Sequence, residues 1–203
     1  MTAHALDFVR VLDDAPRGCW VDLAEGFLDG AEAVEWMARL PEALPFAAEA
    51  PVMFGRPVPV RRRSCGIGEA GVVYRYAGVE RAAHPWPAGF EAVLARVRAS
   101  AGEHFNYALC NQYPDGAAAM GWHTDDEASL VPGDPIASLS LGAPRDFAQR
   151  LGRAGPTVCT VTLPPGSLLV MGGATQRHYQ HRLPSRARCT APRINLTFRR
   201  MRG

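Results

Sequence analysis

Apolar residues recur at helical spacing in two segments of the first half of the chain. The first segment, residues 31–40, follows Asp29, whose side chain can cap a helix N-terminus, and is expected to stop at Pro41. Its apolar side is expected to comprise Val34, Met37 and Ala38. The second segment runs from about residue 87 to residue 102. It places four apolar residues on one stripe at the i, i+3, i+4, i+7 spacing: Phe90, Val93, Leu94 and Val97.

From residue 105 the pattern changes to short apolar runs bounded by Gly, Pro and Asp, which is typical of β-strands. The predicted strands cover residues 105–113, 135–142, 145–150, 157–163, 167–171 and 194–201. Two helices followed by many short strands predict an α+β chain whose second half is a β-sandwich or jelly roll backed by helices. A stretch rich in proline, residues 41–59, is expected to be a connector.

The composition fits one compact domain. The chain has 203 residues, of which 47% are hydrophobic and 21% charged, so it can bury a core without help. Its five cysteines form no CxxC pair and predict reduced thiols. An acidic start without a basic, apolar leader argues against a signal peptide, and no run reaches the roughly 18 apolar residues of a membrane span. We therefore expect a cytoplasmic protein without membrane contact.

The charge is unevenly distributed along the chain. All 22 basic residues are arginine. The formal net charge of +2 does not by itself indicate a class of binding partner. Acidic residues are concentrated at the start, and none follows Asp146. Such a distribution is compatible with a basic face that binds phosphates.

One pair of polar residues is a candidate metal site. His123 and Asp125 lie two apart, so in extended chain their side chains project from the same face. His178 or His181 could supply a third ligand. Two histidines and one carboxylate form the facial arrangement that leaves positions open on Fe(II) for a cosubstrate and oxygen. The alternatives are a hydrogen-bonding pair without metal, or a zinc hydrolase site.

The C-terminal segment alternates strictly between polar and apolar residues. Its polar face comprises Arg193, Asn195, Thr197 and Arg199. Its apolar face comprises Ile194, Leu196 and Phe198. Because a guanidinium group binds a carboxylate through two hydrogen bonds, a dicarboxylate reaching from the metal to these arginines would satisfy both ends. The alternative is an exposed strand face with solvated arginines.

These motifs together resemble the AlkB-type Fe(II)/2-oxoglutarate dioxygenases, which oxidatively dealkylate nucleic-acid bases. The resemblance covers about Met53 to Arg200 and rests mainly on His123-Thr124-Asp125, His181 and the segment Arg193 to Arg199. Further matching segments are Phe54-Gly55-Arg56, Tyr74 to Gly78, Asn111-Gln112-Tyr113, Asp125-Asp126-Glu127, Pro135 to Ala143 with Arg145 and Phe147, and Gly166 to Met171. Two departures are Tyr179, where the family usually has Trp, and Gly172-Gly173.

The resemblance implies a double-stranded β-helix, or jelly roll, with an N-terminal nucleotide-recognition lid. It implies one domain over residues 1–203, with the N-terminal helix and lid in about 1–90 and the supporting helix and catalytic core in about 91–203. The implied iron ligands and catalytic residues are His123, Asp125 and His181, with His178 as the runner-up ligand. The cosubstrates would be 2-oxoglutarate and molecular oxygen. The implied 2-oxoglutarate contacts are Asn111, Tyr113, Arg193, Asn195 and Arg199.

The resemblance also implies action on single- or double-stranded DNA carrying N1-methyladenine or N3-methylcytosine, and we expect a monomer. A base inside a duplex must be flipped to reach such a site. The expected substrate contacts are Phe54 as a wedge, Arg62 at phosphate, Tyr74, Tyr76 stacked opposite His123, Asp126 facing the cationic base, and Glu127 beside it. The alternatives are RNA or tRNA as substrate, and a catalytically silent nucleic-acid binding module.

Overall fold

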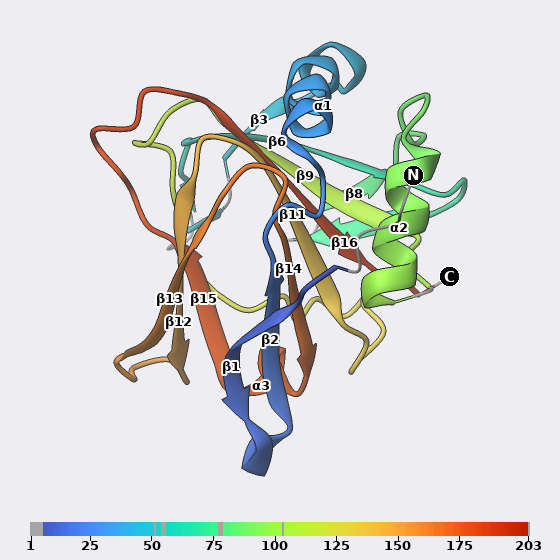
Figure 1. Ribbon diagram of the computed structural model, residues 1–203. Coiled ribbons are helices and arrows are strands. Elements are labelled where there is room, and N and C mark those ends of the chain that lie inside the picture. The colour runs from blue at the N-terminus through green and yellow to red at the C-terminus, as the bar shows by residue number, and fades with distance from the viewer. Residues whose placement is uncertain (1–5, 51, 54–55, 77–78, 103, 203) are drawn as a thin grey trace.

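Two antiparallel sheets make up most of the computed structural model, which describes residues 6–50, 52–53, 56–76, 79–102 and 104–202 (Figure 1). The large sheet has the strand order β1-β2-β14-β11-β16-β9-β6-β3, and the small sheet the order β10-β15-β12-β13. The large-sheet strands are β1 (Val9–Asp14), β2 (Cys19–Ala24), β3 (Ala47–Glu49), β6 (Val60–Gly68), β9 (Tyr107–Tyr113), β11 (Ile136–Gly142), β14 (Leu168–Gly173) and β16 (Arg193–Arg199). The small-sheet strands are β10 (Met120–His123), β12 (Arg145–Leu151), β13 (Thr157–Leu163) and β15 (Tyr179–Leu183).

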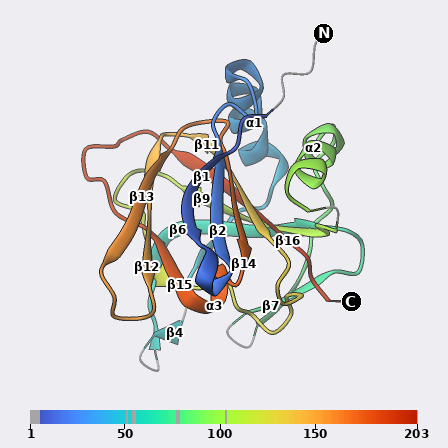
Figure 2. The same cartoon turned by 60° about the horizontal axis from the view of Figure 1, so that its bottom comes forward.

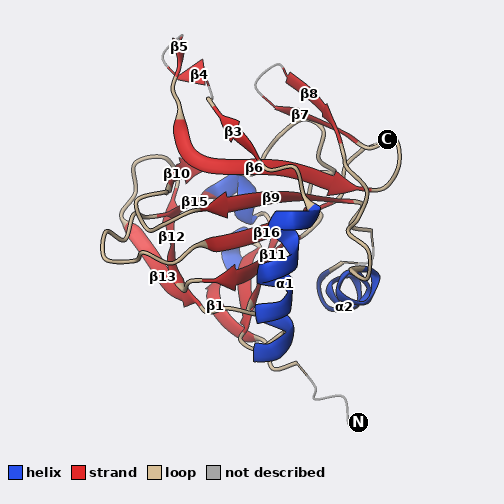
Figure 3. Cartoon of the chain, turned by 90° about the horizontal axis from the view of Figure 1, so that it is seen from above, coloured by secondary structure: helices blue, strands red, loops and turns tan. Residues whose placement is uncertain are grey.

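The remaining elements are two hairpins and four helical segments. The hairpins pair β4 (Val52–Met53) with β5 (Arg56–Pro57), and β7 (Val73–Tyr76) with β8 (Val79–Ala82). They flank β6 in sequence. Figure 2 shows β4 and β7 at the lower end of the molecule, and Figure 3 shows both hairpins on the β3–β6 side of the large sheet. The helical segments are η1 (Ala15–Arg17), α1 (Gly30–Ala43), α2 (Glu91–Ala101) and α3 (Thr175–His178). The chain is therefore mostly β with few helices, and its two sheets are consistent with the predicted jelly roll.

Apolar side chains hold the two sheets together. Leu169 and Met171 on β14 belong to the same buried cluster as Phe147 on β12 and Leu163 on β13. Figure 3 shows the small-sheet strands on one side of the large sheet, with α1 and α2 on the other side. Each sheet thus has an inner face toward its partner, and the helices cover the outer face of the large sheet.

The six strands predicted from the sequence are confirmed within a few residues, but several others were missed. The predicted connector, residues 41–59, instead holds β3, β4, β5 and the end of α1. β10 was missed because it has only four residues, and β15 because it is short and carries polar residues on both faces. In β15, His181 faces inward while Gln180 and Arg182 face outward, so no alternation of apolar and polar residues marks the strand.

Helix α1 begins where expected but buries a different face. Asp29 and Glu32 form a capping box, in which each side chain accepts a hydrogen bond from the other residue's backbone N–H. The buried residues are Ala33, Trp36 and Leu40. Of the predicted apolar side, Met37 packs against the core, but Val34 is 72% exposed and Ala38 is exposed. The larger Trp36 and Leu40 side chains bury more apolar area and so decide which side faces the sheet.

Pro41 does not stop α1 as predicted, because the helix continues to Ala43. A proline in the last turn removes one hydrogen bond, to the carbonyl four residues earlier, and leaves the following turn intact. The second helix is confirmed: Val93, Leu94 and Val97 of α2 are buried, and Phe90 precedes them as the N-cap residue.

The helices pack on the apolar face of β16. Phe198 of β16 stacks with Phe90 at a ring distance of 6.3 Å and with Trp86 at 6.3 Å. Ile194 and Leu196 are fully buried in the same cluster. The apolar half of the alternating segment therefore faces the helices, which leaves its polar half on the inner face of the sheet.

Among the described residues, no helix has the length and apolar character needed to cross a bilayer. The predicted cytoplasmic location and the monomeric state stay predictions. Phe54 lies outside the described residues. Tyr74 and Tyr76 lie on β7, and their side chains are likewise outside the description.

Substitution in α1 tests which side of the helix faces the sheet. Trp36→Ala should lower the free energy of unfolding by about 3–5 kcal/mol, because it removes a buried aromatic side chain and leaves a cavity. Val34→Ala should change it by less than about 0.5 kcal/mol, since Val34 is exposed. Urea denaturation of both variants measures the difference, and equal losses would contradict the observed orientation of α1.

Candidate metal centre

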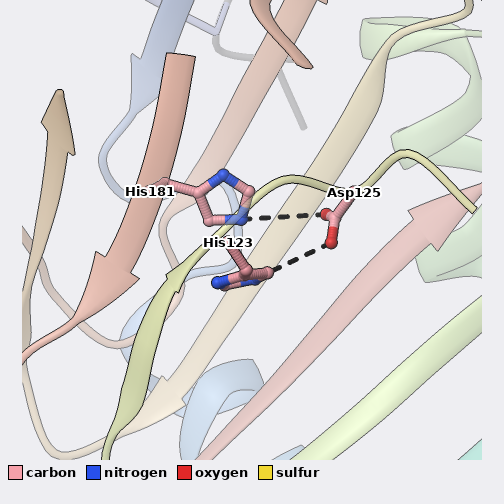
Figure 4. A group of neighbouring side chains, drawn as sticks. All are labelled: His123, Asp125 and His181. Carbon is pink, nitrogen blue, oxygen red and sulfur yellow. Dashed lines mark ion pairs between the residues drawn. The ribbon is translucent and has the colours of Figure 1, made fainter. Parts of the chain in front are cut away.

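Three side chains converge between the sheets as the sequence predicted. His123 ends β10, Asp125 follows two residues later, and His181 lies in the middle of β15. Figure 4 shows both imidazoles pointing toward the Asp125 carboxylate. The Asp125 carboxylate oxygens lie 3.8 Å from Nε2 of His123 and 3.9 Å from Nε2 of His181.

The donor set fits a divalent metal ion. One ligand atom from each residue lies within 4.8 Å of the other two. Donors bound about 2.1 Å from one ion lie roughly 3–4 Å apart, so small side-chain rotations would complete the site. Two imidazoles and one carboxylate are the facial set found on non-haem Fe(II). His178, the runner-up, is not part of this group, and it lines a different cavity.

Hydrogen bonds fix the orientation of the ligands. The Nδ1 atom of His123 lies 2.9 Å from the carbonyl oxygen of Gly121, to which it donates when protonated. The backbone N–H of Asp125 donates to Oε1 of Gln176 at 2.9 Å. Such partners leave Nε2 of His123 and the Asp125 carboxylate directed at the metal position.

The electrostatics of the site favour the forms that bind metal. Burial alone would raise the pKa of Asp125, but the charge of Arg199, joined by the two histidines when they are protonated, holds it below its usual value. The nearest Arg199 nitrogen lies 2.8 Å from Asp125 Oδ1. Burial lowers the pKa of His181 to about 3, so its imidazole is neutral at physiological pH. An ionised carboxylate and a neutral imidazole can bind a metal without first losing a proton.

The polar face of β16 lines a small cavity beside the triad. Strand register places Asn195 between Asn111 of β9 and Ser140 of β11. The cavity has a volume of about 40 Å³. Its lining includes the three ligands and all five residues predicted to contact 2-oxoglutarate: Asn111, Tyr113, Arg193, Asn195 and Arg199. The structure therefore brings these residues together.

Arg193 carries a buried charge in this cavity. Its side chain is 2% exposed and donates a hydrogen bond to Oγ of Ser140 at 2.9 Å. Burial lowers the pKa of Arg193 to about 10. Among the described residues, no carboxylate forms an ion pair with Arg193, and its Nε atom has no hydrogen-bond partner. A buried cation in this setting favours an anionic ligand.

The predicted substrate residues lie in several different surroundings. Glu127 pairs with Arg199 at 3.0 Å, and Arg199 also holds Asp125. Asp126 is exposed and lines a second cavity of about 420 Å³, to which Asp125 also contributes. Arg62 is half-buried and forms an ion pair with Glu49. Of the predicted substrate residues that the structure describes, Asp126 and Glu127 line this cavity, and Asp126 is the exposed one.

Sequence reasoning did not assign a role to several residues of the site. The Arg145 side chain is 1% exposed and donates to the carbonyls of Ala118 and Pro184, at 2.9 and 2.7 Å. The Phe147 ring stacks on His181 at 5.2 Å. The alternation of β12 could have placed both on one inner face. Gln176 lies in α3, a single helical turn for which the sequence gives no periodic signal.

The two departures from the family pattern have structural explanations. The Tyr179 hydroxyl donates to Asp14 Oδ2 at 2.7 Å, which joins β15 to the β1–β2 hairpin. A Cβ atom on Gly172 would lie 1.9 Å from the Trp20 ring. A side chain at this position would therefore displace the Trp20 indole, which packs directly on the backbone.

Comparison with known proteins agrees with this geometry. The profile of the 2OG-Fe(II) oxygenase superfamily matches residues 21–199. The chain belongs to this superfamily. Membership and the observed triad together imply Fe(II) and 2-oxoglutarate as metal and cosubstrate.

Similar proteins place the chain in the AlkB family, as the sequence motifs indicated. The DNA oxidative demethylase ALKBH2 of Mus musculus is 42% identical in an alignment of length 156, which covers 73% of this chain and 65% of that protein. The Arabidopsis thaliana protein of the same name is 30% identical, over 92% of this chain and 70% of its own length. The alpha-ketoglutarate-dependent dioxygenase alkB homolog 3 of Rattus norvegicus is 34% identical, over 88% and 63%.

The chain spans less than two thirds of the mouse and rat relatives. A solved structure, that of OsALKBH1, superposes with a TM-score of 0.62 at 20% identity, over 88% of this chain and 97% of that one. At this identity the likeness shows a shared fold.

The shifted pKa of His181 predicts how the metal-free protein responds to acid. The unfolded chain takes up a proton near pH 6.5, whereas folded His181 does so only near pH 3. Stability should therefore fall as the pH drops through this window, by about 2 kcal/mol between pH 7 and 5. In His181→Asn this contribution is absent, so urea denaturation should show a smaller loss. Equal losses in both proteins would contradict the buried, neutral state of His181.

Proposed function

We propose that this protein is an Fe(II)- and 2-oxoglutarate-dependent demethylase of N-alkylated bases in DNA. The observation that carries the proposal is one cavity that holds both the metal triad and Arg193, a buried cation without a described carboxylate partner. Relatives named DNA oxidative demethylase support the choice of substrate. When bound, iron and 2-oxoglutarate supply the oxidation of the alkyl carbon, and the protein supplies binding, orientation and exclusion of water.

Arg193 is assigned to the distal carboxylate of 2-oxoglutarate. Its guanidinium carbon lies 5.4 Å from the Tyr113 ring centroid, so the ring restricts the directions in which the guanidinium group can point. Asn111 lines the same cavity, and its buried Oδ1 atom has no partner among the described residues. Asn195 donates to Oγ of Ser138, which holds its amide in place. Arg199, on the same face of β16, donates a hydrogen bond to the metal ligand Asp125.

The larger cavity is assigned to the flipped base. Asp125 and Asp126 line it beside the metal position, and Arg153 and Arg177 are exposed at its border. A carboxylate here favours a cationic base such as N1-methyladenine or N3-methylcytosine over the neutral parent base. The arginines are suited to the flanking phosphates, which supply affinity without sequence preference.

The lid proposal rests on the hairpins around β6. We assign Tyr74 and Tyr76 on β7, Phe54 between β4 and β5, and Arg62 on β6 to nucleotide recognition, by the family resemblance. Arg62 would have to exchange its ion pair with Glu49 for a phosphate. Since β1, β2, β3 and β6 all join the large sheet, we propose one domain in which the lid is an extension of the sheet edge.

Mass spectrometry of methylated oligonucleotides tests the proposed activity. With Fe(II), oxygen and 2-oxoglutarate, an N1-methyladenine oligonucleotide should lose the mass of one methylene group, and no loss should occur without 2-oxoglutarate. Asp125→Ala should abolish the reaction. Asp146→Ala is the matched control, because that carboxylate accepts a solvent-exposed hydrogen bond from Thr162 of β13 and should be dispensable.

Single-stranded DNA, duplex DNA and RNA of one sequence should be compared in this assay. Demethylation of DNA at a higher rate than RNA supports the proposed substrate. Faster turnover of RNA would show that RNA, not DNA, is the substrate. Succinate formation without any demethylation would contradict the assignment of alkylated bases as substrates.

Asp126→Asn tests the recognition of the cationic base. The variant should lower kcat/KM for N1-methyladenine by roughly tenfold, because it removes the charge but keeps the size of the side chain. Its kcat/KM for N3-methylthymine, a neutral base, should change little. A similar loss on both bases would show that Asp126 acts by shaping the pocket and would contradict the electrostatic role.

A further inference from the structure

A cluster of three side chains lies on the outer face of the small sheet, directly behind the metal ligands. The guanidinium carbons of Arg150 and Arg182 each lie over the Trp122 ring, 4.5 Å from its centroid. The three residues come from β12, β15 and β10, so the cluster crosses three strands. Trp122 immediately precedes His123, and Arg182 immediately follows His181. We call these three residues the outer cluster.

The outer cluster coincides with a β-bulge in the strand that carries His123. Met120 pairs with Leu183 and His123 pairs with His181, so Gly121 and Trp122 together lie opposite one residue of β15. In a regular strand, residues 120 and 123 would face opposite sides. Here Met120 and His123 both line the small cavity. The bulge therefore turns His123 toward the metal position.

The bulge also orients the imidazole ring. Its Gly121 carbonyl lies 2.9 Å from Nδ1 of His123. Because a carbonyl can only accept, this contact favours the tautomer that carries its proton on Nδ1 and leaves Nε2 for a metal. The position of one carbonyl in the bulge thus sets both the tautomer and the direction of the ligand atom.

The pairing of β10 with its neighbour gives this bulge little support. β10 is an edge strand of only four residues, and only two of its residues are in register with β15. Trp122 is half-buried by the cluster. Arg150 also donates to Oε1 of Gln180, whereas no acceptor contacts the Arg182 guanidinium among the described residues. The main partner of the Arg182 guanidinium is therefore the indole ring, as in a cation–π contact.

We propose that Trp122 is a positioning residue for the metal centre. Through the outer cluster it holds the bulge that directs His123 inward and sets its ring. The inference rests on the proposed function as far as metal binding is concerned, and it requires neither 2-oxoglutarate nor a nucleic acid.

Binding of Mn(II) to the metal-free protein tests the proposal without turnover. Calorimetry should show that Trp122→Ala weakens Mn(II) binding by roughly tenfold, the usual effect of removing a group that supports a ligand. Trp122→Phe keeps an aromatic face and should stay within about threefold of wild type. Arg39→Gln is the matched control, because it removes a guanidinium that lies 4.3 Å from the Trp36 ring in α1 and should leave Mn(II) affinity unchanged.

Thermal unfolding of the metal-free proteins separates positioning from general stability. Weaker Mn(II) binding in Trp122→Ala, rescued by Phe, with a Tm loss no larger than that of Arg39→Gln, supports the proposal. Wild-type affinity in Trp122→Ala, or an equal loss in Trp122→Phe, overturns it. If Trp122→Ala does not fold, the double variant Arg150→Gln/Arg182→Gln takes its place. Weaker Mn(II) binding in the double variant then supports the proposal, and wild-type affinity overturns it. Failure of the wild-type protein to bind Mn(II) would instead refute the proposed function.

Discussion

Burial of β16 on both faces is the constraint on which the structure depends. All seven residues from Arg193 to Arg199 are buried. The apolar side chains of this strand pack under α1 and α2, while its polar side chains face the small sheet. Because side chains alternate along a strand, one short segment both anchors the core and lines the candidate active site. A shift of one residue in register would place two arginines in the core and is therefore strongly disfavoured.

The charges of the site are arranged around this strand. At one end, Arg199 is balanced by Asp125 and Glu127. At the other, Arg193 lies buried with a serine hydroxyl as its partner, next to Arg145, which is held by backbone carbonyls. A dicarboxylate would supply the missing negative charge beside Arg193 with one carboxylate. Its other carboxylate would reach the metal position near Arg199. This arrangement supports the proposal that the buried Arg193 receives an anionic ligand.

The polar face of β16 followed from the sequence because these residues lie in a regular strand. The alternation of residues 193–199 gave the polar face, and the spacing of His123 and Asp125 gave the metal pair. The sequence could not show that Arg199 holds Asp125, because that contact joins residues 74 apart. Nor could it show the bulge at Trp122, since an extra residue in a strand is defined only by its partner. The face of α1 was predicted wrongly because spacing alone does not weigh the size of Trp36 against that of Val34.

The most direct test of this account is whether one cavity binds metal and 2-oxoglutarate together. Oxygen-free calorimetric titration of 2-oxoglutarate into Mn(II)-loaded protein should show binding of one molecule per chain. Binding should be lost when the metal is withheld and weakened in Arg193→Gln. Equal affinity for the metal-free protein, or unchanged affinity in Arg193→Gln, would contradict the assignment of this cavity to 2-oxoglutarate.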